Sequence, residues 1–207
     1  RVSVSSAGGP AQQYWYGVLF KLDSAGNLVF SLPFGDPIDI SQGLGVAVDG
    51  VGNIFLTGTY QGDLVIDGET LSAPTSTEMF LAKLDPAGNS LWAISYDATG
   101  GVQPAQVVAL SGGDIVIPGY LQGQVYFGGP SVLNMSTPGM FLVRLDTDGG
   151  FVWADTYPYA LPYDAVAGPN DEIAVVGGYN APTDLGGGIL PSINGWGAAF
   201  FGIFDEN

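Results

Sequence analysis

The segment MFLAKLDPAGNSLW at residues 79–92 combines an apolar run, a charged pair, a Gly/Asn turn and a tryptophan. It returns almost unchanged as MFLVRLDTDGGFVW at 140–153. Shorter copies are LFKLDSAGN at 19–27 and FFGIFDEN at 200–207, and the aspartates of successive copies are 62, 61 and 59 residues apart. A recurring match at a nearly constant period indicates a fold built from repeated units rather than a single reactive motif.

A second block repeats between these copies. GVAVDGVGNIFLTGTYQG at 45–62 aligns without a gap with QVVALSGGDIVIPGYLQG at 106–123, and more weakly with DAVAGPNDEIAVVGGYNA at 164–181. Each full period is expected to contain four short strands, which in its first complete copy are residues 45–48, 53–60, 79–85 and 90–96. Tight Gly/Asn turns join the first strand to the second and the third to the fourth, as in antiparallel hairpins. The longer segment 61–78 has room for a small hairpin of its own.

Four antiparallel strands per repeat, followed by a connection to the next unit, are typical of a β-propeller blade. Blades pack face to face, which explains middle strands such as NIFLTG at 53–58 and DIVIPG at 114–119, where apolar residues hardly alternate with polar ones. We therefore predict an all-β fold, a β-propeller-like array of four-stranded antiparallel blades with a repeat of about 61 residues.

The combination GVAVDGVGNIFLTG and FLAKLDPAGNSLW resembles the bacterial β-propeller repeat family of the SBBP type, found in exported proteins of myxobacteria and their relatives. The resemblance covers roughly residues 16–205. It implies a propeller of a secreted, periplasmic or cell-surface protein, generally without assigned catalysis, and it transfers no functional residue. Two departures are AGPNDE at 167–172 in place of VDGVGN, and GIFD at 202–205 in place of AKLD.

We predict a single domain over residues 1–207 that contains incomplete blades at its ends. Its parts are a half blade at 16–34, blades at 43–97 and 104–158, and a partial blade at 162–205. Joining the two ends would give only three blades, below the usual minimum of about four. We therefore expect an incomplete ring that another chain or chain segment completes. The chain begins at Arg1 rather than methionine, so we expect a processed protein or a fragment.

Composition excludes several classes of function. The formal charge is −16, from 20 acidic and four basic residues, so the surface repels nucleic acid and anionic membranes. No uninterrupted apolar stretch approaches the length of about 18 residues needed to insert in a membrane. The absence of His and Cys excludes thiol nucleophiles, Ser-His-Asp triads and imidazole or thiolate metal sites. These features favour a soluble exported protein.

The most conspicuous residues of the repeat are interpreted as structural. Three of the four bases form Lys/Arg-x-Asp pairs at one repeat position, and Phe30, Trp92 and Trp153 share another, which favours packing between blades. The segment LDTDGG at 145–150 resembles the start of a calcium loop, but the sister copies read as tight turns. Calcium at Asp146 and Asp148 is the alternative, and no other cofactor is expected.

Two kinds of connection are predicted to be long, variable loops: those between the second and third strands of a blade, and those from the fourth strand of one blade to the first of the next. The latter lie at 34–42, 96–104 and 157–164. Variable loops on a regular scaffold are where recognition usually resides. Their carboxylates and aromatic rings could bind a protein or glycan; otherwise they form a solvated acidic rim. The candidate ligand-binding residues are Asp36, Asp39, Tyr96, Asp97, Tyr157, Tyr159, Tyr163 and Asp164.

Three functions follow from these features. The favoured one is a non-catalytic exported or surface scaffold or adhesion module, which binds a protein or glycan through the variable loops. The second is a structural subunit that assembles through open blade edges. The third is a carbohydrate-active enzyme that uses two loop carboxylates, although no paired-acid motif is visible.

Overall fold

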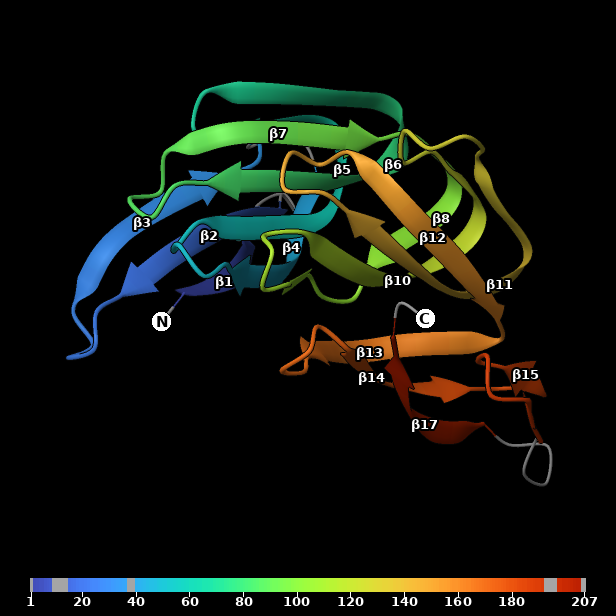
Figure 1. Cartoon of the computed structure of the whole chain (residues 1–207). Coiled ribbons are helices and arrows are strands. Elements are labelled where there is room, and N and C mark those ends of the chain that lie inside the picture. The colour runs from blue at the N-terminus through green and yellow to red at the C-terminus, as the bar shows by residue number, and fades with distance from the viewer. Residues whose placement is uncertain (1, 9–14, 37–39, 192–196, 206–207) are drawn as a thin grey trace. The chain divides into compact units, whose positions relative to one another are not determined.

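The computed structural model describes residues 2–8, 15–36, 40–191 and 197–205, and the chain divides into two compact units, residues 1–97 and 98–207. The described residues form antiparallel sheets and no helix, so the all-β prediction is confirmed. Figure 1 shows the strands coloured in chain order, from blue at the N-terminus to red at the C-terminus. The predicted propeller ring remains a prediction.

Unit 1 contains two groups of strands, here named sheet 1 and sheet 2. Sheet 1 consists of β1 (Val2–Gly8), β2 (Trp15–Leu22) and β3 (Leu28–Phe34), paired in that order. Sheet 2 consists of β4 (Ile40–Val48), β5 (Ile54–Ile66), β6 (Glu69–Leu84) and β7 (Ser90–Tyr96), also paired in chain order. Single bridges from β2 to β4 and from β3 to β5 join the two groups. Sheet 2 is the predicted four-stranded unit at 43–97, with longer strands.

Unit 2 contains sheet 3, sheet 4 and a small hairpin. Sheet 3 consists of β8 (Ala98–Pro104), β9 (Val108–Ala109), β10 (Ile115–Val125), β11 (Leu133–Leu145) and β12 (Phe151–Pro158). Sheet 4 consists of β13 (Ala160–Ala167), β14 (Ile173–Tyr179) and β17 (Ala198–Phe204), with β17 at its edge. The hairpin pairs β15 (Thr183–Asp184) with β16 (Ile189–Leu190).

The tight turns of the repeat form as the sequence predicts. In 85–89 the Asp85 Oδ1 atom accepts the N–H groups of Ala87 at 2.8 Å and of Asn89 at 2.9 Å. Gly88 has a φ of 95°, the left-handed region in which a residue without a Cβ is favoured. The turns at 23–27 and 49–53 have the same bonds. These turns fix the register of each hairpin.

The structure corrects the predicted loops at 96–104 and 157–164. Residues 98–104 form β8, which pairs with the outer half of β10, and residues 160–167 form β13. The segment 61–78 continues β5 and β6, and its inner part is the small hairpin expected there. Glycine is the physical reason for the error at 96–104: Gly100 has a φ of 98° and lies where a Cβ would be 2.2 Å from the Gln122 carbonyl oxygen. It permits close strand approach rather than a turn.

Within each unit two sheets pack on each other through the same repeat positions. We call the face of a sheet that carries Leu19, Leu81, Leu142 or Phe201 its forward face, and the opposite side its backward face. In unit 1 the backward face of sheet 2 packs on the forward face of sheet 1. The apolar residues of this interface include Ile54, Leu56, Phe80 and Ala82 of sheet 2 and Leu19, Phe30, Leu32 and Phe34 of sheet 1. In unit 2 the backward face of sheet 4 packs likewise on the forward face of sheet 3; its core includes Ile173, Val175 and Phe200 from sheet 4 and Val116, Met140, Leu142, Trp153 and Tyr157 from sheet 3. The repeated sequence positions thus form the same kind of sheet–sheet interface in each unit.

Candidate functional site

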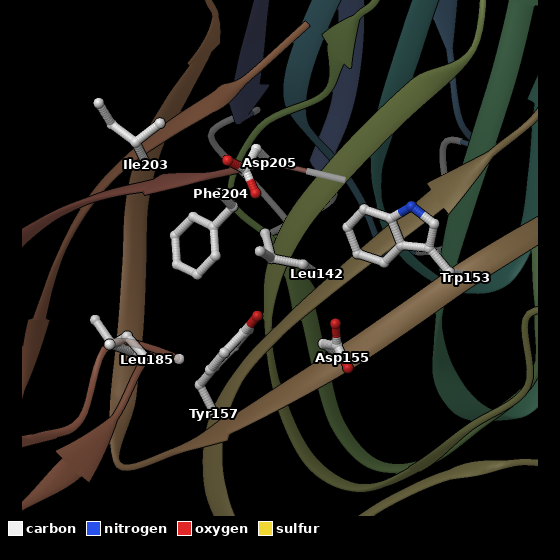
Figure 2. Close-up of a pocket in the computed structure, with 10 residues that line it drawn as sticks. Leu142, Trp153, Asp155, Tyr157, Leu185, Ile203, Phe204 and Asp205 are labelled. Carbon is white, nitrogen blue, oxygen red and sulfur yellow. The ribbon is translucent and has the colours of Figure 1, made fainter. Parts of the chain in front are cut away.

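A cleft of about 530 Å³ lies in unit 2 where sheet 3 faces the edge strand of sheet 4 (Figure 2). Alternate residues of a strand share a face, so β12 contributes three lining side chains. The cleft is lined by Leu142 of β11, by Trp153, Asp155 and Tyr157 of β12, by Leu185, Gly186 and Gly187 after β15, and by Ile203, Phe204 and Asp205 at the end of β17.

Aromatic packing and charge together set the character of the cleft. The Tyr157 ring packs edge-on against Phe204, with 5.4 Å between ring centroids. Burial raises the pKa of the Tyr157 phenol to about 12, and the charge of Asp155 adds to the effect. Tyr157 therefore stays neutral at physiological pH and can donate a hydrogen bond. The described lining residues contain two carboxylates and no base, so the cleft suits a neutral or cationic group next to aromatic rings.

Of the eight predicted ligand-binding residues, one lines this cleft: Tyr157. Tyr159 is the one residue between β12 and β13 and has a φ of 69°, so it makes a corner rather than a loop. Tyr163 is exposed on β13. Asp164 accepts the backbone N–H of Ala165 at 2.8 Å.

The remaining predicted residues belong to unit 1. Tyr96 is buried at the end of β7, and Asp97, which follows it, is exposed. Asp36 lies just after β3 and is partly buried. Asp39 lies outside the described residues. The predicted set is thus spread over both units. Tyr157 lines the cleft described above, and Tyr163 lines a separate hollow of about 300 Å³ in unit 2, together with Leu161, Tyr179 and Ala198.

Sequence reasoning missed Asp155, Phe204 and Asp205. A signal for Asp155 was present, because Trp153 and Tyr157 flank it at alternate positions of one strand. The residues of β17 gave no such signal, since their position depends on how sheet 4 packs on sheet 3.

The carboxylates suggested for calcium take part in a turn. Asp146 Oδ1 accepts the N–H groups of Asp148 at 2.9 Å and of Gly150 at 2.8 Å, which is the bonding of Asp85 in its own turn. Within the described ranges there is no group of three or more His, Cys, Asp or Glu side chains suited to a metal ion. The tight turn at 146–150 therefore explains the position of the Asp146 carboxylate.

Unit 1 holds a separate polar network. The Tyr60 hydroxyl donates to Ser95 Oγ at 2.7 Å, and Ser95 Oγ donates to the buried Glu78 carboxylate. Burial raises the pKa of Tyr60 to about 12. The network satisfies polar groups beside the irregularity between Tyr60 and Gly62, so it stabilises the bent β5–β6 hairpin.

Comparison with known proteins leaves the family open, because neither a family model nor a curated protein matches the chain. No helix among the described residues is long and apolar enough to cross a membrane.

Proposed function

We propose that the chain is a non-catalytic repeat scaffold of an exported or surface protein, arranged as part of a β-propeller-type array, which assembles with further sheets of its own kind. The support for this proposal comes from sheet 4 rather than from the predicted loops, most of which are strands. We therefore assign the proposed function to contact between sheets rather than to recognition of a ligand by loops.

One repeat position carries the proposal. Leu19, Leu81 and Leu142 are equivalent residues of the strand that leads into the aspartate turn in sheets 1, 2 and 3 (β2, β6 and β11), and each is 0% exposed. The equivalent residue of sheet 4 is Phe201, which is 70% exposed. A large aromatic side chain at a position that is otherwise fully buried indicates an unfilled interface.

The neighbours of Phe201 extend this apolar surface. Ile203 is 65% exposed on the same strand, and Val176, which pairs with Phe201, and Val166 of β13 are also exposed on this forward face. Fully burying such side chains contributes about 1.5–3 kcal/mol each. Four partly exposed ones would supply roughly 4–7 kcal/mol, which offsets only the lower range of association costs. We therefore expect weak, reversible assembly.

The occupant we propose is the backward face of sheet 1 from a second copy. That face carries Val18 and Phe20, which are half-buried, and Val29, which is exposed. Such a contact joins two different surfaces, so it continues from copy to copy as a ring or an open chain. The charge of −16 opposes association, and salt should strengthen it by screening.

Sedimentation equilibrium in about 0.5 M salt tests the proposal, because screening is then nearly complete. We expect the average mass of the unaltered chain to rise with concentration beyond a dimer. Phe201→Lys should keep the chain monomeric, whereas Val51→Lys, at an exposed turn residue of sheet 2, should not. A strictly monomeric unaltered chain would contradict the proposal, as would equal behaviour of the two variants.

The cleft favours a second candidate function, glycan binding. Trp153 and Phe204 offer ring surface, and Asp155 and Asp205 offer carboxylates at the same opening (Figure 2). Binding to a glycan array that Asp155→Asn and Asp205→Asn both abolish would support this candidate. Release of reducing sugar by the unaltered chain would instead support the carbohydrate-active enzyme.

A further inference from the structure

Residues 98–143 of unit 2 differ from the other parts of the chain in charge. The chain carries 20 acidic and four basic residues, yet this segment contains one charged residue, Asp114. The segment supplies β8, β9, β10 and most of β11. A surface that these strands expose is therefore polar but almost uncharged, in a protein whose net charge is −16.

Seven polar side chains from three adjoining strands share one face of sheet 3. Directly opposite residues of an antiparallel pair lie on the same face. Tyr120 of β10 lies opposite Gln103 of β8. Gln124 of β10 lies opposite Thr99 of β8 on one side and Asn134 of β11 on the other. We name this surface the amide–tyrosine face; it consists of Thr99, Gln103, Tyr120, Gln122, Gln124, Tyr126 and Asn134, all exposed except the half-buried Tyr120.

Sheet 2 shows which residues of this region the packing requires, because QGDLVIDG at 61–68 aligns with QGQVYFGG at 122–129. The inward residues stay apolar and buried; they are Leu64 and Ile66 in sheet 2, and Val125 and Phe127 in sheet 3. The outward residues change from Thr59, Asp63 and Val65 to Tyr120, Gln124 and Tyr126. Sheet 3 has thus lost a charge and gained two aromatic rings at positions where the fold does not need them.

The two tyrosines present their rings on this face. The Tyr120 hydroxyl donates to Gln122 Oε1 at 3.1 Å. A Cβ at Gly101 would lie 3.4 Å from a ring carbon of Tyr120, so the ring extends across β8, where glycine leaves room for it. Tyr126 is 46% exposed. Six residue steps separate the two tyrosines, which corresponds to roughly 20 Å along the strand.

The chemistry of this face matches a sugar chain. Side-chain amides and phenols both donate and accept hydrogen bonds, as sugar hydroxyls do, and aromatic rings stack on the C–H face of a pyranose. Three adjoining strands form a broad surface rather than a hollow, and the residues of the face line neither the cleft nor the hollow of unit 2. Such a surface fits a long, extended ligand, and the net charge of −16 repels an acidic one.

We propose that the amide–tyrosine face binds an extended neutral polysaccharide, a β-1,4-linked chain of glucose, mannose, xylose or N-acetylglucosamine. This inference goes beyond the proposed scaffold, because it uses one face within unit 2 and no contact between copies. It also uses a surface different from the cleft, where the candidate glycan site contains Asp155 and Asp205.

Depletion of the full chain from solution by insoluble cellulose, mannan, xylan and chitin tests the inference. We expect at least one of the four to retain the chain, with little change between about 0.05 and 0.5 M salt, because the contact contains no ion pair. Tyr126→Ala should weaken retention at least about threefold, and Tyr126→Trp should preserve it, since an aromatic ring remains.

Two glutamines at one repeat position provide a matched pair of variants. Gln122→Ala should weaken retention, whereas Gln61→Ala, at the equivalent exposed position of sheet 2, should not. Circular dichroism checks that each variant is folded. Retention by none of the four polysaccharides would overturn the inference, as would equal effects of the two glutamine variants. Loss of retention in Asp155→Asn would place the binding in the cleft and overturn it too. Self-association that Tyr126→Ala abolishes, without retention by a polysaccharide, would identify the face as a protein interface instead.

Discussion

Gly58 of β5 lies beneath the ring of Phe80, and this contact recurs through the chain. A Cβ at Gly58 would lie 1.9 Å from the Gln42 carbonyl oxygen and 2.7 Å from a ring carbon of Phe80. Gly119 and Gly177 meet Phe141 and Phe200 in the same way, at 2.3 Å and 2.6 Å. Gly58→Ala is therefore expected to destabilise unit 1 by forcing β4 away from β5.

The magnitude follows from two opposing effects. Overpacking a core typically costs about 1–3 kcal/mol, while replacing glycine by alanine gains about 0.4–1 kcal/mol through the unfolded chain. The cost at Gly58 lies at the upper end because one of the two obstructing atoms belongs to the backbone and cannot rotate away. We expect a net loss of about 2 kcal/mol in the free energy of unfolding.

Urea unfolding followed by circular dichroism measures this loss, with Gly50→Ala as the matched control. Gly50 lies in the turn at 49–53, where a Cβ would meet nothing within 4 Å. The control should stay within about 0.5 kcal/mol of the unaltered chain, as exposed substitutions usually do. Equal stability of the two variants would refute the packing of Phe80 over Gly58.

Three further predictions concern hydrogen bonds and titration. Tyr60→Phe should cost about 1 kcal/mol in urea unfolding, because it removes one donor while Ser95 keeps its bond to Glu78; no change would contradict the network. The Asn89 side-chain amide, followed by its backbone N–H, lowers the pKa of Asp85 below 3.8. The resulting stability is present above pH 3.8 and is lost as the pH falls through the folded pKa. Asn89→Ala should therefore destabilise the chain at pH 6, and the difference in stability should shrink as the pH falls through the folded pKa; a gap independent of pH would argue against it. Tyr157→Phe should remove one phenol that titrates near pH 12 in ultraviolet absorbance, and an unchanged titration there would contradict its burial.

How far the sequence predicts this fold depends on the kind of signal. Turns such as DPAGN at 85–89 could be predicted because Asp, Gly and Asn act through local hydrogen bonds and φ. The extent of the strands could not, since Gly100 and Gly123 look like loop residues but permit backbone contact within sheet 3. Their role becomes visible only once β8 pairs with β10.

The candidate site was harder to predict than the fold. Tyr157 was selected as a loop residue and is instead the last but one residue of β12, and its neighbour in space, Phe204, is far away in sequence. The cleft exists because sheet 4 packs on sheet 3 with β17 as the edge strand among the described residues. Neither condition has a local signature in the chain.

Cysteine cross-linking between separate copies tests the central claim most directly, because the chain contains no Cys of its own. Two single variants, Phe201→Cys on sheet 4 and Val29→Cys on sheet 1, are mixed in equal amounts and oxidised. We predict mixed dimers well in excess of either homodimer, and no such excess when Val51→Cys replaces Val29→Cys. Mixed dimers no more abundant than random pairing would contradict assembly of this face with the first sheet of a second copy.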